Sequence, residues 1–175
     1  MCYSVEAVAN FFINKSLKTE TLLSNMHLQK IVFFAHAAYF KSHQKPLFSD
    51  PVVAWQHGPV VVSLYHELKQ YESGKVTELI QRLEPWGNKG AFQFKMIIPT
   101  IPKDDEEVVA FLDQAWKHLS EVPTWKLRAI SHAEGGAWYK TVESQNIDPK
   151  NDQAVKQGLP RNLTILDSVI KECGR

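Results

Sequence analysis

The stretch AWQHGPVV, residues 54–61, decides how the middle of the chain folds. The β-branched and aromatic run 52–56 is typical of a short strand, which Gly58 and Pro59 should end. Proline suits the first turn of a helix, where its missing N–H costs nothing, so we expect a helix to begin at Pro59. His57 lies between these two elements. It is either a catalytic group on a loop or a part of the joint between strand and helix.

Apolar periodicity predicts helices on both sides of this joint. The strongest covers 26–40, where apolar residues recur every three or four positions and three phenylalanines widen the apolar surface. Such a helix is normally central to a core. We expect further helices from Ser4 to Lys15, from Pro59 to Gly74, from Asp104 to Leu119, from Thr124 to Glu134 and from Asn162 onward, with a short helical piece over 76–83. The inward-facing residues of the last helix should be Leu163, Leu166, Val169 and Ile170.

A second strand is expected within 91–98, where apolar and polar residues alternate. Two strands make only a marginal sheet, so we expect this strand and 52–56 to form a small antiparallel ribbon packed on helices. The polar segment 143–160 should be a loop with a weak turn or two. The predicted fold class is α+β and mainly α-helical. It has about six helices in one domain over 1–175, with the small antiparallel β ribbon.

Composition narrows the function classes. The net charge is +1 and no run of Lys or Arg stands out, which argues against a nucleic-acid partner. No stretch approaches the ~18 consecutive apolar residues of a membrane-spanning helix, and the first residues lack the features of a signal peptide. Cys2 and Cys173, one at each end, are no disulfide framework. We therefore expect a cytoplasmic protein with no membrane partner and with reduced thiols.

Motifs of catalysis and of cofactor binding are absent from the chain. Neither GxGxxG, GxxxxGK[ST] nor GxSxG occurs. The stretch HELKQ begins like a zinc-protease motif but has Gln70 in place of the second histidine. The triplet that starts at His132 looks like a deaminase signature, but the Pro-Cys-x-x-Cys that supplies its other ligands is missing. We expect no catalytic, metal-binding or cofactor-binding residues.

Two interpretations of the histidines remain open. His36 lies on the apolar helix, where we expect a neutral, hydrogen-bonded side chain at the margin of the core. The alternative is an enzyme or metal protein that gathers histidines from separate elements, such as His57 and His132.

Three blocks of the chain together resemble one family. They are MHLQKIVFFAHAAYF (26–40), KPLFSDPVVAWQHGPVVVSLYHELK (45–69) and LRAISHAEGGAWYKT (127–141). In order and spacing they are similar to the Panacea domain, the SocA-like antitoxin family, whose members include the phage-associated protein GepA. The family pattern has Gln-Lys in the first block and Gly-Pro in the second, and both are kept here. In the third block Ala137 stands where proline usually precedes the tryptophan.

The resemblance implies a mainly helical fold and a function without catalysis. It implies an antitoxin of a bacterial or prophage toxin–antitoxin system, which neutralises a cognate toxin by direct protein–protein binding. The toxin is expected to be encoded by a neighbouring gene. A protease adaptor for the toxin is the alternative within the family. The toxin's identity and the oligomeric state stay open.

The resemblance also selects residues. The family-signature positions, with a structural role or a contact to a partner, are Trp55, Gly58, Pro59, Val60, Tyr65, His132 and Trp138. Outside these, Trp86 lies on the turn EPWGNKG between proline and glycine. It is a candidate partner contact, and the alternative is a cover over the edge of the core.

Overall fold

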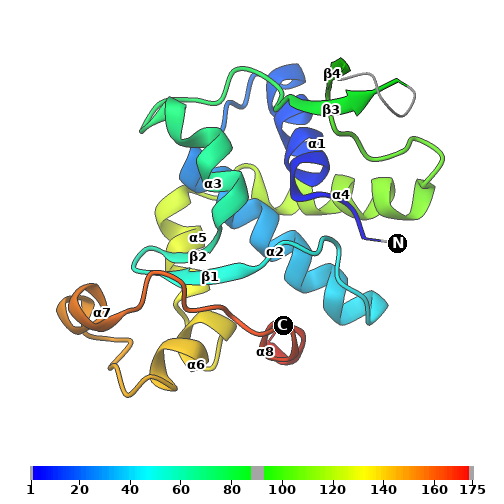
Figure 1. The fold of residues 1–175 in the computed structure, drawn as a ribbon. Helices are drawn as coiled ribbons and strands as arrows, with labels where there is room; N and C mark the ends of the chain where they lie inside the picture. The colour runs from blue at the N-terminus through cyan, green and yellow to red at the C-terminus, as the bar shows by residue number, and fades with distance from the viewer. Residues whose placement is uncertain (1, 88–92, 174–175) are drawn as a thin grey trace.

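The computed structural model describes residues 2–87 and 93–173. Over these ranges the chain forms eight α-helices and two separate two-stranded antiparallel sheets (Figure 1). The predicted α+β, mainly helical class is confirmed. The predicted number of helices is too low, because the short helices α6 and α7 lie where no helix was expected.

The elements have the following bounds. The helices are α1 (Val5–Lys18), α2 (Asn25–His43), α3 (Val62–Leu68), α4 (Glu106–Leu119), α5 (Thr124–Ser131), α6 (Ala137–Glu143), α7 (Asp152–Gly158) and α8 (Asp167–Cys173), and a 3-10 turn (Lys69–Tyr71) follows α3. The strands are β1 (Val52–Trp55), β2 (Gly58–Val61), β3 (Arg82–Trp86) and β4 (Gln93–Ile97).

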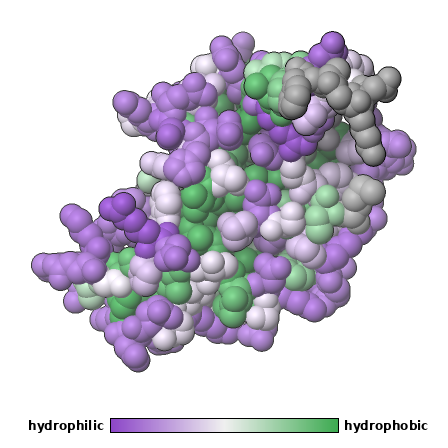
Figure 2. Space-filling view, viewed as in Figure 1, coloured by the Kyte–Doolittle hydropathy of each residue, from purple (hydrophilic) through white to green (hydrophobic). Residues whose placement is uncertain are grey.

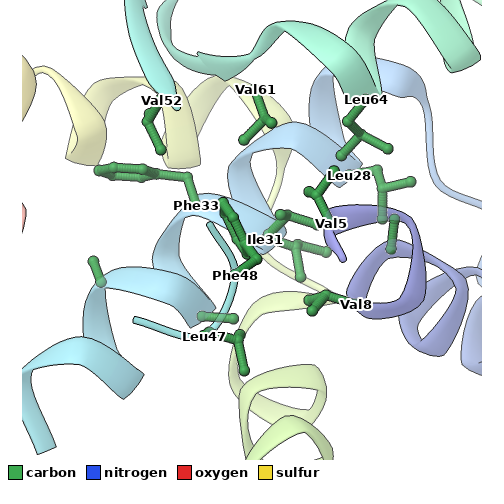
Figure 3. Close-up of a cluster of buried hydrophobic side chains, with 14 of the residues drawn as sticks. Val5, Val8, Leu28, Ile31, Phe33, Leu47, Phe48, Val52, Val61 and Leu64 are labelled. Carbon is green, nitrogen blue, oxygen red and sulfur yellow. The ribbon is translucent and has the colours of Figure 1, made fainter. Parts of the chain in front are cut away.

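Helix α2 is the centre of the molecule, as its sequence predicted. It packs against α1, α3, α4, α5, α8 and β2. Figure 3 shows Leu28 and Ile31 of α2 among buried side chains from α1, β1, β2, α3 and the segment that contains Phe48. Ser24 accepts a hydrogen bond from the backbone N–H of His27, which satisfies one otherwise unpaired donor at the start of the helix. None of the described helices is long and apolar enough to span a membrane.

The joint at residues 54–61 is a β-hairpin and not a strand followed by a helix. β1 pairs with β2, and Ala54 lies opposite Pro59. The predicted helix start at Pro59 is therefore wrong, and α3 begins at Val62. Ala54 N donates to Leu163 O, on the side of β1 that faces away from β2. Ala54 and Pro59 are therefore an opposed pair that exchanges no backbone hydrogen bonds, and a proline without an N–H is tolerated there.

The second sheet also differs in its pairing. The strand expected within 91–98 is confirmed as β4, although residues 91 and 92 lie outside the described ranges. Its partner is β3 and not the strand at 52–56, which pairs with β2. The helical piece predicted over 76–83 is wrong, because its last two residues belong to β3 and the rest is not helical.

The C-terminal part corrects two further expectations. Segment 163–165 runs along β1, with Ile165 N donating to Val52 O at 2.8 Å, so the last helix starts at Asp167 and not at Asn162. Of its predicted inward residues Ile170 is buried, but Leu166 is exposed. The polar segment 143–160 is not only loop, since it contains α7.

Candidate functional site

Two polar side chains of α2 hold strand β2. The side-chain amide of Gln29 donates from Nε2 to Val61 O at 3.3 Å, and its Oε1 accepts from Val61 N at 3.0 Å. The next residue of α2, Lys30, donates from Nζ to Pro59 O at 2.9 Å. These bonds satisfy backbone groups of β2 that no strand pairs, and such groups are costly to leave unpaired when buried. The hairpin is thus attached to the central helix by side chains.

Gly58 lies where the hairpin comes closest to α2 and to the end of α5. Its φ is +100°, a conformation that residues with a side chain rarely adopt. A Cβ at this position would lie 2.7 Å from both Lys30 Nζ and Ser131 Oγ, and 3.2 Å from His132 Nε2. Only glycine therefore allows the three elements to meet at this spacing.

Two tryptophans continue the contact toward α6. The ring of His132 stacks on Trp138, with centroids 3.8 Å apart and planes 8° from parallel. Trp138 Nε1 donates to Trp55 O at 2.8 Å. The rings of Trp55 and Tyr65 meet edge-on, with centroids 4.8 Å apart. Trp55 Nε1 donates to Arg161 O at 2.9 Å. We call Gln29, Lys30, Trp55, Gly58, Pro59, Ser131, His132 and Trp138 the signature cluster.

The signature cluster carries an excess of basic groups. Burial, with a smaller contribution from the Arg128 charge, lowers the pKa of Lys30 to about 7. Burial, then the charges of Arg128 and Lys30, lowers the pKa of His132 to about 4. The nearby acid, Asp152, lies 3.4 Å from Arg128 and its side chain is largely exposed. At neutral pH His132 is therefore uncharged and stacks as a neutral ring.

The cluster is arranged for cohesion and not for access. A lysine with a pKa near 7 is a typical nucleophile or base. However, Lys30 is only 1% exposed and its nitrogen is already bonded to Pro59 O. A substrate cannot reach the amine without opening the hairpin. The cluster thus connects α2, β2, α5 and α6 through direct contacts.

Residues 28–139 match the family described as "Antitoxin SocA-like, Panacea domain". The chain belongs to this family. The Antitoxin SocA of Caulobacter vibrioides (strain NA1000 / CB15N) is 27% identical over 166 residues, covering 95% of this chain and 79% of the relative. No solved structure matched the chain. The resemblance inferred from the three sequence blocks is confirmed.

Most of the expected signature residues of this Panacea domain come together. Five of the seven belong to the signature cluster, Tyr65 touches it through Trp55, and Val60 is buried in β2 opposite Val53. Sequence analysis missed Gln29, Lys30 and Ser131. The signal for the first two was present, because they are the Gln-Lys pair of the family pattern within an otherwise apolar helix.

His57 lies near His132: burial lowers the pKa of His132 most, and the charge of His57 is among the smaller contributions. His57 is exposed, and no group of three or more His, Cys, Asp or Glu side chains in the described part of this Panacea domain is placed to hold a metal ion. His36 is buried against Phe48, with ring centroids 4.1 Å apart. The expected hydrogen bond of His36 is wrong, since neither ring nitrogen has a partner among the described residues.

An apolar hollow lies away from the hairpin, and Ser131 of the signature cluster is one of its lining residues. It has a volume of about 760 Å³ and lies between α2, α4, α5, α6 and α8. Its walls include Phe33, Phe34, Phe111 and Ile130, so it is mainly apolar. Trp86, the other candidate contact, lies on β3 and is 60% exposed, which shows that it does not cover the core.

Proposed function

We propose that this chain is an antitoxin that neutralises a cognate toxin by direct protein–protein binding and without catalysis. Membership of the SocA-like antitoxin family and the similarity to an Antitoxin SocA support the antitoxin role. The family assignment implies a toxin partner, and binding is the proposed way of acting on it.

One observation carries the choice of binding over catalysis. The polar groups that distinguish the family, above all Gln29 and Lys30, are used in internal hydrogen bonds to the backbone of β2. Large apolar side chains are meanwhile exposed elsewhere, including Trp86 and Phe94. Exposed aromatic residues are the type that dominates protein–protein interfaces. The family-specific residues thus build a scaffold, and the surface is left for the partner.

Co-expression tests this proposal. Each gene product encoded next to this chain is expressed from an inducible promoter, with and without the chain, and growth is followed. Neutralisation predicts that one neighbour stops growth and that the chain restores it. If no neighbour is toxic, or if a toxic one is not rescued, the proposal is wrong.

A second measurement separates binding from delivery to a protease. The half-life of the toxin is followed after translation is stopped, in the presence and absence of the chain. Direct neutralisation predicts restored growth with an unchanged or longer half-life. A shorter half-life that depends on a host protease would show an adaptor instead.

A further inference from the structure

The β3–β4 ribbon is an arm that the helical body supports only at its base. β3 and β4 pair over their full described length, from Arg82 opposite Ile97 to Trp86 opposite Gln93. Neither strand packs extensively against any other described element. Except for the half-buried Glu84 and Ile97, all described residues of both strands are exposed. A two-stranded ribbon without a covered face is only marginally stable in water, which indicates that something else covers it.

The arm has apolar side chains on both faces. Opposed residues of an antiparallel pair lie on the same face, so Leu83, Met96, Pro85 and Phe94 share one face. Trp86 lies on the other face, where Lys95 Nζ is 4.7 Å from the centre of its ring. Hydrophobic side chains face solvent beside the grey atoms at the top of Figure 2, over the β3–β4 ribbon. A flat partner surface would leave one of these faces in water.

A single buried asparagine of α1, Asn10, binds both chain segments at the base of the arm. Asn10 Nδ2 donates to Ile80 O and to Pro99 O, both at 2.9 Å, and its Oδ1 accepts from Ile80 N at 2.7 Å. Ile80 precedes β3 and Pro99 follows β4, so one side chain holds the two chains at the base. A fixed base lowers the ordering cost of binding, because the arm already points in one direction.

We propose that the β3–β4 ribbon is the toxin-binding arm and that it inserts into an apolar cleft of the toxin. This inference rests on the proposed function and adds the surface and the shape of the partner. Charge contributes little to the choice of partner, because Arg82 is paired with Glu84 and Lys95, which keeps its charge over the Trp86 ring, adds a single positive charge to the ribbon. The partner is therefore recognised by apolar contact on both sides of the arm.

The exposed area decides between a cleft and a second copy of the chain. Leu83, Trp86, Phe94 and Met96 are 55–62% exposed and together offer roughly 500 Å² of apolar surface. This is less than the ~800 Å² per partner of a stable interface, and the free backbone edges of both strands add further contact area. Two copies joined by the Leu83 face alone would bury roughly 700 Å² in total, well short of the ~1,200 Å² minimum. A cleft that encloses both faces and both strand edges comes closer to this minimum than a second copy on one face does.

The test compares three variants of the chain, two of which replace an exposed tryptophan. The arm variant carries Trp86→Ala and Phe94→Ala, and the control carries Trp125→Ala, which removes a ring that is 72% exposed on α5. A third variant, Ile130→Asp, changes the apolar hollow. Each is co-expressed with the toxic neighbour, and the affinity of the purified pair is measured by titration calorimetry.

The arm variant should lose rescue and bind roughly 100-fold more weakly, since two central aromatic contacts are removed. The two other variants should rescue like the unchanged chain. All three should melt at nearly the same temperature, because the replaced side chains are exposed. If the arm variant binds as tightly as the unchanged chain, or if Ile130→Asp alone abolishes binding, the arm is not the toxin-binding surface.

Failure of the two proposals is distinguishable. If the unchanged chain rescues no neighbour, both proposals fall together. If it rescues and the arm variant rescues equally, only the arm is refuted and the antitoxin function stands. Light scattering of the purified chain measures its oligomeric state. A dimer that the arm variant disrupts would show that the arm binds a second copy of the chain and not a cleft of the toxin.

Discussion

The ammonium nitrogen of Lys30 lies 2.9 Å from the carbonyl oxygen of Pro59, inside the molecule. This bond connects the central helix to the strand that begins at Gly58 and gives the buried nitrogen of Lys30 a hydrogen-bond partner. An ammonium donor compensates a buried carbonyl oxygen more strongly than a neutral donor does. Its desolvation has a cost, which appears in the pKa of about 7.

Lys30 should make stability depend on pH above neutrality. Between pH 7 and 10 the unfolded chain carries a proton on Lys30 that the folded chain has lost, so the unfolding free energy rises with pH. The rise is on the order of 3 kcal/mol. Lys30→Met fills similar space without titrating and should remove this rise. Urea unfolding at several pH values measures it, with Lys126→Met, at an exposed lysine of α5, as the control. Equal slopes in both variants would show that Lys30 does not titrate in this range.

Gly58 should tolerate no side chain, and Gly135 is its matched control. Both have positive φ, +100° and +77°, but a Cβ at Gly135 has nothing within 4 Å. Gly135→Ala should cost only backbone strain, about 1–2 kcal/mol. Gly58→Ala adds overpacking against Lys30 and Ser131, which are held by their own bonds, and should cost about 1–3 kcal/mol more. Thermal unfolding of both variants gives the difference, and equal losses would refute the close contact.

Much of the helical scaffold was predictable from local patterns. Helix α2 was recognised because its apolar residues follow the helical period on nearly every side, and Ser24 supplies a side-chain cap. The hairpin was not predictable in this way, because Gly58-Pro59 looks the same at a strand end, a helix start or a turn. The hairpin's second strand is held by Gln29 and Lys30, about 30 residues earlier in the chain, and such distant contacts are not visible in a local pattern.

The candidate site was only partly predictable for the same reason. The signature residues were found through the three blocks, but their meeting at Gly58 depends on where α5 ends relative to β2. The β3–β4 pairing likewise joins 82–86 to 93–97, and neither strand has a buried face. The alternation within 91–98 predicted β4, but 82–86 shows no sustained alternation, so β3 and the pairing of the two strands were missed.

His36 should weaken the fold in acid. Burial lowers the pKa of His36 to about 4. Between pH 6.5 and 4, His36 is therefore protonated in the unfolded chain and neutral in the folded chain. Stability from this residue is complete above pH 6.5 and is lost as the pH falls, by roughly 3 kcal/mol at pH 4. His36→Leu removes this titration and should reduce the loss of stability between pH 6.5 and 4 by roughly 3 kcal/mol, while the contribution of His132, whose pKa is also about 4, remains. Chemical unfolding between pH 7 and 4 tests it, and an unchanged profile would mean that the acid loss arises elsewhere.

Asn10 should control the order of the arm without controlling the rest of the fold. Asn10→Ala removes three hydrogen bonds from Ile80 and Pro99 at the base of the ribbon. Amide hydrogen exchange in β3 and β4 should then speed up at least about tenfold, since each lost buried bond costs about 1–3 kcal/mol. Exchange in α2 should change much less. A uniform increase over all helices would mean that Asn10 serves the whole core and not the arm.

Neutralisation by binding is tested most directly with purified components. A toxin that the co-expression experiment identifies is titrated with the chain, without any protease, while the toxin's own activity is measured. Binding predicts that activity falls to zero at a fixed molar ratio. The arm proposal adds that activity persists at the same ratio when the Trp86→Ala, Phe94→Ala variant replaces the chain. Full toxin activity in the presence of excess unchanged chain would contradict neutralisation by direct binding.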